Sequence, residues 1–331
     1  MKILFVFTGG TIGSTEQQGI RSADPTKPYK IISLYKESFG IDFDYDTAEP
    51  YSELSENNTG LHITSLISCI GEKLTSDYDG IIVTHGTDTL QYTSAAIGYA
   101  FGLNTPPICL VSSNAPIEDK SSNALQNLRA AVCFIKEKLG RGVFSIYAND
   151  GETVTCHRGT RLAGSLAYSD HQQSIFGSIY GSFSKDMSFT QNASYSETPD
   201  EIAPFGCVSL SECSDRILVV HPSIGMVYPA IPESTKYILL NTYHSGTINT
   251  KSKALIDYLA EAKKKGAEVF ALGVDSAISY DSASCFAKLG ITPIKNLAPI
   301  SAYMKLWLAD AAGISPDAAI SSSLSGDIYK A

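Results

Sequence analysis

The chain opens with an apolar run that stops at a pair of glycines, and this feature limits the folds available to it. Lys2 to Phe7 is short and rich in residues that favour a buried β-strand. Thr8 is followed by Gly9 and Gly10, where the backbone can turn sharply and pass close to a bound molecule. Thr11 then stands at the carboxyl end of the expected strand, the edge where open α/β sheets bind ligands. Taken alone, the motif favours a plain strand-to-loop turn with a capping threonine over a binding site.

A second apolar run ends in the same way and adds a carboxylate. Ile81 to Val83 leads into His85-Gly86-Thr87-Asp88-Thr89. Thr87 and Asp88 are adjacent, so both could hold one amino-acid-sized ligand, and Asp88 could also cap a helix that begins near Thr89. Two hydroxyl-bearing strand ends in one sheet, one of them with an acid, are uncommon by chance. Together they favour a binding site.

Apolar runs alternate with helical patterns along the chain, which predicts a largely parallel sheet covered by helices. The expected strands are Ile3–Phe7, Ile81–Val83, Ile108–Val111 and Val143–Tyr147, then Ile217–Val220, Tyr237–Asn241 and Val269–Val274. The expected helices are Gly60–Leu74, Thr89–Phe101 and Ser122–Leu139, then Ser252–Lys265, Ile300–Ala312 and Pro316–Ser322. The polar stretch 185–212 reads as a linker or surface excursion.

The predicted fold class is therefore α/β, with two α/β domains. The larger N-terminal domain, residues 1–190, has a mostly parallel, doubly wound sheet and carries the substrate site. A linker follows at 191–213, and a smaller C-terminal α/β domain occupies 214–331. A length of 331 residues also favours two domains over one core.

Composition excludes several classes of protein. The net charge of −9 and the single basic run, Lys263 to Lys265, argue against a nucleic-acid surface. The N-terminal apolar run is too short for a signal peptide, and no stretch approaches the roughly 18 apolar residues of a membrane helix. The seven cysteines are scattered without a close metal-type pair, which fits reduced, mostly buried thiols. We expect a cytoplasmic protein with no membrane or nucleic-acid partner.

The two glycine motifs together resemble the bacterial-type L-asparaginase family, and more closely its cytoplasmic type. The matching segments are Thr8-Gly9-Gly10-Thr11-Ile12 and His85-Gly86-Thr87-Asp88-Thr89, and the resemblance extends over most of the chain. It implies hydrolysis of L-asparagine through an acyl-enzyme, with Thr11 as the attacking hydroxyl. It assigns Thr87 as a second essential threonine and Asp88 as the acid that contacts the substrate's α-amino group. It implies no metal and no organic cofactor.

The resemblance extends to two further turns. Ser55, in Leu54-Ser-Glu-Asn-Asn-Thr59, matches the family's serine for the substrate α-carboxylate, and Glu56 beside it would suit an ammonium group. Gly10 and Gly86 would line the same pocket with backbone. In Val111-Ser-Ser-Asn-Ala-Pro116, Ser113 and Asn114 match a turn that approaches the substrate amide. The alternatives are a polar surface loop with a helix cap at Thr59, and a purely structural turn at Ser113.

One position departs from the family pattern. The family places a lysine after an Arg-Gly-x-Arg stretch, and here Arg158-Gly159-Thr160-Arg161 leads to Gly164, or to Ala163 with a shift of one residue. No lysine lies between Lys138 and Lys185. An ammonium group beside Thr87 would favour loss of its hydroxyl proton, which Gly164 cannot do. Loss of one member of a coupled site can cost several powers of ten in rate.

Few side chains are candidates to replace that lysine. Tyr29 lies in the loop where relatives keep an activating tyrosine, although the spacing is about five residues too long. His157 and His171 flank the position of the missing lysine, and each is alternatively a solvated loop histidine. His85 also occurs in family members, so we expect it to belong to the strand end rather than to act as a new base.

The second domain and the assembly are expected to contribute as well. Ser245 and Thr247, in the turn after Tyr237–Asn241, resemble a family turn that reaches a neighbouring subunit's pocket, or they simply cap a helix. This implies a homodimer or homotetramer. The leading hypothesis is an asparaginase acting on a small amino-acid amide. The alternatives are a homologue that binds asparagine or aspartate without hydrolysing it, and an ammonia-releasing amidotransferase subunit. The sequence does not rank asparagine against glutamine, since one methylene in a pocket is worth only about 1–3 kcal/mol.

Overall fold

The computed structural model describes residues 1–10, 14–17, 20–23, 28–74, 77–149, 153–277 and 280–330. Within these residues the larger sheet has eight strands in the order β10-β9-β8-β7-β6-β5-β1-β4. Their bounds are β1 Lys2–Phe7, β4 Asp44–Ala48, β5 Gly80–Thr84, β6 Ile108–Val111, β7 Val143–Ala148, β8 Val154–Arg158, β9 Gly181–Phe183 and β10 Phe189–Gln191. The strands from β4 to β7 pair in parallel, and β8, β9 and β10 continue the sheet in antiparallel pairings.

The strand order creates one reversal. β1 lies between β4 and β5, so the chain leaves β1 toward one side of the sheet and later returns to its other side. In open α/β sheets such a switch point leaves a crevice beyond the carboxyl ends of the two central strands. The turn after β1 and the turn after β5 therefore meet at this crevice.

Helices cover both faces of the larger sheet, as the doubly wound prediction requires. On one face Ile3 and Phe5 of β1 join a core with α1 (Pro28–Phe39) and α4 (Ala124–Lys136). On the other face Leu4 and Val6 pack with side chains of α2 (Gly60–Lys73) and α3 (Leu90–Phe101). The alternation along β1 follows from the period-two geometry of a strand.

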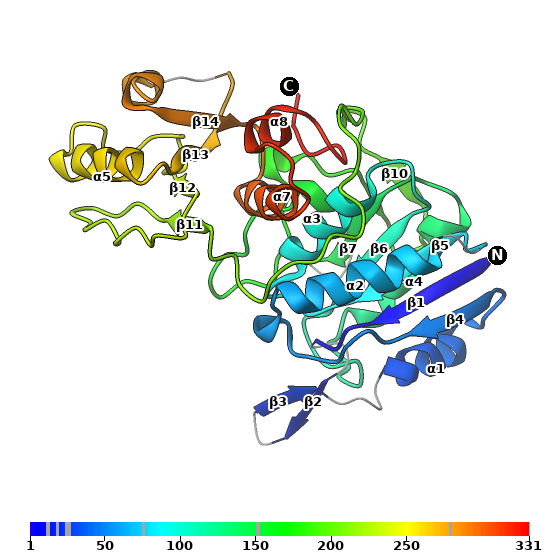
Figure 1. Cartoon of the computed structure of the whole chain (residues 1–331). Helices are drawn as coiled ribbons and strands as arrows, with labels where there is room; N and C mark the ends of the chain where they lie inside the picture. The colour runs from blue at the N-terminus through cyan, green and yellow to red at the C-terminus, as the bar shows by residue number, and fades with distance from the viewer. Residues whose placement is uncertain are drawn as a thin grey trace.

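The second sheet is smaller, entirely parallel and without a reversal. Its four described strands run in sequence order as β11 Ile217–Val220, β12 Tyr237–Asn241, β13 Glu268–Val274 and β14 Ile291–Lys295. α5 (Lys253–Lys264) covers one face and α7 (Pro299–Ala311) the other. The remaining elements are the hairpin β2 Ser14–Gln17 and β3 Ile20–Ala23, with the short helices α6 Asp281–Ser284 and α8 Pro316–Ser321. Figure 1 shows this sheet beside the larger one, with α7 and α3 between them.

α7 connects the two units. Met304 and Leu308 pack against α3, and Leu306 packs into the second sheet. Between them the buried Lys305 forms an ion pair of 2.7 Å with Asp327, which also accepts a hydrogen bond of 3.0 Å from Tyr99 of α3. The two units are therefore held together by a shared helix and by the C-terminal segment. The division into 1–190, 191–213 and 214–331 remains a prediction.

The predicted fold class is confirmed, and each strand expected from an apolar run is present. The structure also contains elements that the apolar runs did not predict, namely α1, α6, β2, β3, β4, β8, β9, β10 and β14. The interpretation of 185–212 as a linker or surface excursion is wrong in part. Phe189–Gln191 forms the edge strand β10, and Phe205 and Leu210 are buried against the core that contains α3. The helix expected at Ser122–Leu139 spans Ala124–Lys136, and Lys138 beyond it has a positive φ of 55°.

All seven cysteines are unpaired, but only Cys109 and Cys156 are fully buried, so the expectation of mostly buried thiols is wrong. No helix in the described part of the chain is long and apolar enough to cross a membrane.

Candidate active site

The turn after β1 is built by backbone contact with a second segment. Gly10 N–H donates to the Glu53 carbonyl at 2.9 Å, and Glu53 N–H donates to the Thr8 carbonyl at 3.1 Å. Gly9 and Gly10 have positive φ values of 93° and 76°. A Cβ on Gly9 would lie 2.4 Å from the Glu53 carbonyl oxygen, so only glycine allows this approach. Thr11, the expected nucleophile, follows directly and lies outside the described residues.

The turn after β5 closes on the first turn. A Cβ on Gly10 would lie 2.2 Å from the Gly86 nitrogen, and a Cβ on Gly86 would lie 2.3 Å from Ser55 Oγ. Three segments far apart in sequence are thus in contact at Gly10, Ser55 and Gly86. This brings together three of the residues expected to bind substrate, at the switch point of the sheet.

Thr87 and Asp88 extend from this contact toward solvent. Thr87 is half-buried and Asp88 is exposed. The Asp88 carbonyl accepts a hydrogen bond of 3.0 Å from Gln91 Nε2, in the first turn of α3. An exposed carboxylate beside a half-buried hydroxyl can hold an ammonium group through charge-assisted hydrogen bonds.

Ser55 lies in a short 3-10 turn, Ser55–Asn57, that is braced from within. Glu53 Oε1 accepts hydrogen bonds of 3.0 Å from both Leu54 N–H and Asn57 Nδ2, and these bonds, that of Asn57 first, lower the pKa of the Glu53 carboxyl. Ser55 is buried and Glu56 is exposed. The expected helix cap at Thr59 is also present, as a capping box with His62. The loop therefore has a structural cap and holds Ser55 against Gly86.

His85 lies under the second turn as a buried, neutral side chain. Burial lowers its pKa to about 4. Its Nδ1 lies 2.8 Å from the Gly86 carbonyl, and its Nε2 lies 2.9 Å from Thr93 Oγ1 and 3.2 Å from Asn58 Nδ2. This agrees with the expectation that His85 belongs to the strand end.

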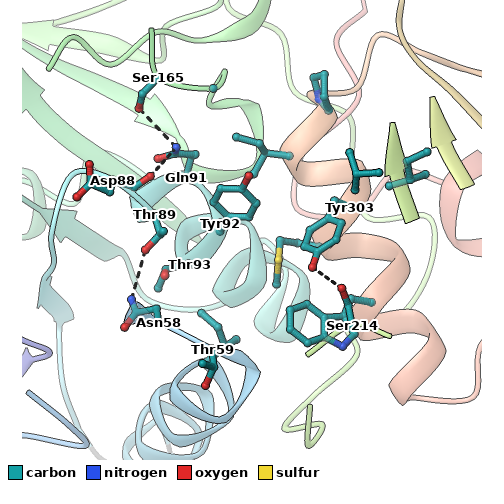
Figure 2. Close-up of a pocket in the computed structure, with 18 of the residues that line it drawn as sticks. Asn58, Thr59, Asp88, Thr89, Gln91, Tyr92, Thr93, Ser165, Ser214 and Tyr303 are labelled. Atoms are coloured by element: carbon teal, nitrogen blue, oxygen red, sulfur yellow. Dashed lines mark hydrogen bonds between the residues drawn. The ribbon is translucent and has the colours of Figure 1, made fainter. Parts of the chain in front are cut away.

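Gly164 lies beside the site on the wall of a cleft of about 950 Å³. Asp88, Gln91, Gly164, Leu239 and Tyr303 are among the residues that line the cleft. Figure 2 shows Gln91 between Asp88 and Ser165, and the Asp88 carboxylate pointing away from Tyr92 and Tyr303. A Cβ on Gly164 would have a single described neighbour within 4 Å, Ile300 Cδ1 at 3.5 Å. The position can accommodate a side chain.

The other predicted site residues are not part of the contact between Gly10, Ser55 and Gly86. Ser113 follows β6 at the same sheet edge, but its hydroxyl donates to the Ala115 carbonyl at 2.7 Å, and Asn114 pairs with Asn123. His157 is buried in β8 with Nδ1 2.8 Å from Ser174 Oγ, and burial lowers its pKa to about 4. His171 is exposed. The side chain of Tyr29 lies outside the described residues.

Ser245 and Thr247 lie in the second unit. Their hydroxyls are 3.0 Å apart, and both line a separate hollow of about 790 Å³ with Tyr243 and Tyr280. Within the described residues, no group of three or more histidine, cysteine or acidic side chains could hold a metal ion.

Three residues of the site are not evident from the sequence. Asn58 and Thr89 connect the serine turn to the second glycine turn, and Gln91 holds the Asp88 carbonyl. The sequence pattern marks Thr89 only as a helix start. Asn58 stands one residue before the expected cap and three residues after Ser55, and only its contacts with His85 and Thr89 show that it connects the two turns.

Comparisons with known proteins agree with this geometry. Residues 2–169 match the family model described as asparaginase, N-terminal. One subunit of the glutamyl-tRNA(Gln) amidotransferase from Pyrobaculum aerophilum is 30% identical over 163 residues, which cover 49% of this chain and 39% of that relative. The chain thus matches well under two thirds of that relative's length.

Two solved structures share the fold over the whole chain. The thermostable L-asparaginase from Thermococcus kodakarensis has a TM-score of 0.79 at 21% identity, covering 100% of both chains. L-asparaginase I from Vibrio cholerae has a TM-score of 0.75 at 19% identity, covering 99% of each chain. At these identities the likeness concerns the fold.

Proposed function

The chain belongs to the asparaginase family and shares the fold of its bacterial and archaeal type I-like members, and from that premise we propose that it hydrolyses L-asparagine to L-aspartate and ammonia. The observation that carries this proposal is the contact of Gly10, Ser55 and Gly86 at the switch point of the sheet. It brings the residue before Thr11 against the serine turn and the turn that bears Asp88.

The proposed chemistry needs a grip on the substrate and a nucleophile. Ser55 would bind the α-carboxylate, and Asp88 with Glu56 would bind the α-ammonium group. Thr11 Oγ would attack the side-chain amide carbon, ammonia would leave with a proton, and water would cleave the resulting ester. Because a threonine hydroxyl is a poor nucleophile, a neighbour must accept its proton, and Thr87 is the proposed member of that route.

Gly164 supports a second candidate function, binding without turnover. The position next to Asp88 and Gln91 offers no cation, and no lysine occurs between Lys138 and Lys185 in the sequence. An amino acid could still be held by Ser55 and Asp88 while the proton route stays incomplete. We therefore expect slow hydrolysis, and tight amino-acid binding with no ammonia release would favour the sensor.

The amidotransferase relative supports a third candidate. If the chain supplies ammonia to a partner enzyme, as an amidotransferase subunit would, asparagine hydrolysis should be weak alone and should rise when the partner is added. This candidate ranks below hydrolysis of the free amino acid, since the two solved structures described above share the fold over almost all of the chain and are asparaginases.

We also propose that the protein is cytoplasmic and works as a homo-oligomer. The segment that follows Gly164 exposes Leu166 at 62% and Tyr168 fully, beside the site. A second copy covering this apolar segment would remove it from water and shield the pocket. Light scattering tests this proposal: a dimer or tetramer supports it, and a monomer at micromolar concentration contradicts it.

Initial-rate ammonia release decides the catalytic proposal. We would compare L-asparagine, L-glutamine and D-asparagine with the wild type, Thr11→Ala and Gly164→Lys. Turnover by the wild type that Thr11→Ala abolishes supports an asparaginase that works without the lysine. A wild type that is inactive, with activity only in Gly164→Lys, favours the sensor. Unchanged turnover in Thr11→Ala would contradict the assignment of the nucleophile.

A further inference from the structure

A chain of hydrogen bonds links the two halves of the candidate site, and donation runs outward from Asn58 to the Gly86 carbonyl on one side and to the Ser55 carbonyl on the other. A carbonyl oxygen only accepts, so the 2.8 Å contact between His85 and the Gly86 carbonyl places the ring proton on Nδ1. His85 is completely buried and neutral, because burial lowers its pKa to about 4. Its Nε2 is therefore an acceptor, and Thr93 and Asn58 donate to it at 2.9 and 3.2 Å.

Asn58 carries this chain to the serine turn. Its Nδ2 has two hydrogens, and besides His85 it reaches Thr89 Oγ1 at 3.3 Å. Thr89 Oγ1 gives its own hydrogen to the Ser55 carbonyl at 2.8 Å, so it accepts from Asn58. With the amide reversed, Asn58 Oδ1 would face the lone pair of His85 Nε2. The orientation of every member is thus fixed by its neighbours.

The consequence concerns the geometry of the substrate grip. Ser55 and Gly86 touch each other, and Gly86 touches Gly10, the residue before Thr11. The backbone contact sets how close the three turns come, while the hydrogen bonds set how the serine turn is oriented on the turn that bears Asp88. The amide side chain of the substrate must then span the distance from the residues that bind its α-carboxylate and α-ammonium groups to the hydroxyl of Thr11.

We propose that Asn58 and His85 are positioning residues that hold Ser55 and Asp88 at a fixed separation and so select the length of the amide side chain. This inference rests on the proposed function, because it concerns the same amino-acid site. A merely structural role predicts something different: loss of Asn58 would lower stability without changing the preference between two substrates that share the α-carbon groups.

The test removes the donors of Asn58 without changing its size. Asn58→Leu is nearly isosteric and cannot donate, and Asn249→Leu makes the same chemical change at an exposed position of the second unit. The measurements are the affinity for L-aspartate by calorimetry and kcat and KM for L-asparagine and L-glutamine. Hydrogen exchange of the amides in residues 54–59 reports the order of the serine turn.

We expect Asn58→Leu to weaken aspartate binding about tenfold and to reduce the ratio of kcat/KM between the two amides by about tenfold. kcat for the preferred amide should stay within about threefold, because the reacting groups are untouched. Exchange in residues 54–59 should become faster. Thr93→Val, which removes the second donor to His85, should have a smaller effect of the same kind, and Thr93→Ser should restore the wild-type values.

An Asn58→Leu protein that folds and keeps both the aspartate affinity and the amide ratio would overturn the inference, and so would an equal loss for both amides. Failure of the proposed function looks different, since the wild type would then neither bind aspartate nor release ammonia. In that case the hydrogen exchange of residues 54–59 decides whether Asn58 positions the serine turn. An exchange rate unchanged by Asn58→Leu would show that Asn58 does not position the turn.

Discussion

One strand in each of the two sheets ends in a similar turn, and only the turn after β5 meets both a second glycine turn and a serine turn. After β5, Gly86, Thr87 and Asp88 follow His85, and Gly86 packs against Gly10 and Ser55. After β12, the turn that contains His244, Ser245, Gly246 and Thr247 is equally rich in hydroxyls, but Ser245 and Thr247 bond to each other at 3.0 Å.

The difference lies in strand order. In the larger sheet the order reverses between β1 and β5, so two glycine turns meet beyond the strand ends. In the second sheet the strands follow sequence order, and no reversal occurs among the described strands. Hydroxyl-rich turns thus occur in both sheets, and the strand order decides which of them meets a second glycine turn.

The largest expected effect comes from a methyl group placed between the two glycine turns. Gly10→Ala combines a positive φ of 76° with a Cβ 2.2 Å from the Gly86 nitrogen. We expect a loss of about 4 kcal/mol or more in the free energy of unfolding. Gly246→Ala, at φ 73° and 3.3 Å from its nearest neighbour, should cost about 1–2 kcal/mol. Urea unfolding measures both, and equal losses would contradict the comparison.

A second prediction uses two buried histidines, His85 in the turn after β5 and His157 in β8. The pKa values of His85 and His157 are about 4 in the folded chain, below the ordinary value of 6.5. The unfolded chain therefore binds more protons between these pH values, so this contribution is fully present above pH 6.5 and is lost as the pH falls toward 4. We expect stability to fall by about 1.4 kcal/mol per pH unit for each imidazole in this window.

Urea unfolding between about pH 4.5 and pH 7.5 tests this slope. His85→Asn should remove one contribution and the double variant with His157→Asn both. A slope that stays the same in the double variant would mean that neither imidazole is responsible. His244, in the turn after β12, is exposed, whereas His85 in the turn after β5 is buried. The experiment therefore concerns a difference in burial between the two turns.

A third prediction compares the polar side chains of the two turns. Asp88→Ala should weaken L-aspartate binding by about 30-fold, or about 2 kcal/mol, because a charge-assisted contact to the ammonium group is lost. Ser245→Ala should change affinity less than about twofold, since its hydroxyl is bonded to Thr247. Calorimetry measures both. A clear loss in Ser245→Ala would indicate instead that this turn reaches the site of a second copy.

The sequence predicts those parts of the fold that depend on local pattern. β1 and β5 are buried on both faces, so their apolar runs are continuous and easily seen. β4, Asp44–Ala48, lies at the sheet edge with three exposed residues, and nothing in its sequence shows that it pairs with β1. β8 contains His157 and Arg158, both buried but polar. β4 and β8 form because they pair with neighbouring strands, β1 and β7, and a local sequence pattern does not show this pairing.

The same limit applies to the site. Short motifs single out Gly10, Ser55, Gly86, Thr87 and Asp88 as candidate residues, and the structure brings Gly10, Ser55 and Gly86 into contact. They do not identify Asn58, because its function depends on His85, which is 27 residues away in the chain. Ser113 shows the opposite case, since a motif suggests a pocket residue and its hydroxyl bonds to the Ala115 carbonyl within its own turn. Contacts between segments carry information that a linear pattern lacks.

The smallest expected effect decides how to interpret the missing lysine at Gly164, which lines the same cleft as Asp88. A Cβ on Gly164 meets only Ile300 Cδ1, at 3.5 Å, among the described residues, and its φ is not in the positive range that favours glycine. We expect Gly164→Ala to be neutral or to stabilise by about 0.5 kcal/mol, through lower entropy of the unfolded chain. Gly159→Ala, in the same stretch, should cost about 1–3 kcal/mol, because its Cβ would lie 3.0 Å from Val143 and 3.1 Å from Ser94.

Thermal and urea unfolding of these two variants distinguish a glycine that the fold requires from one that it only tolerates. If Gly164→Ala is neutral, the absence of a cation beside Asp88 is a chemical property of this site, and any activity of Gly164→Lys reports on catalysis. If Gly164→Ala costs as much as Gly159→Ala, the backbone itself needs glycine there. An inactive Gly164→Lys would then reflect a distorted loop. The site that contains Asp88 would in that case differ from the turn after β12 in its packing as well as in its charge.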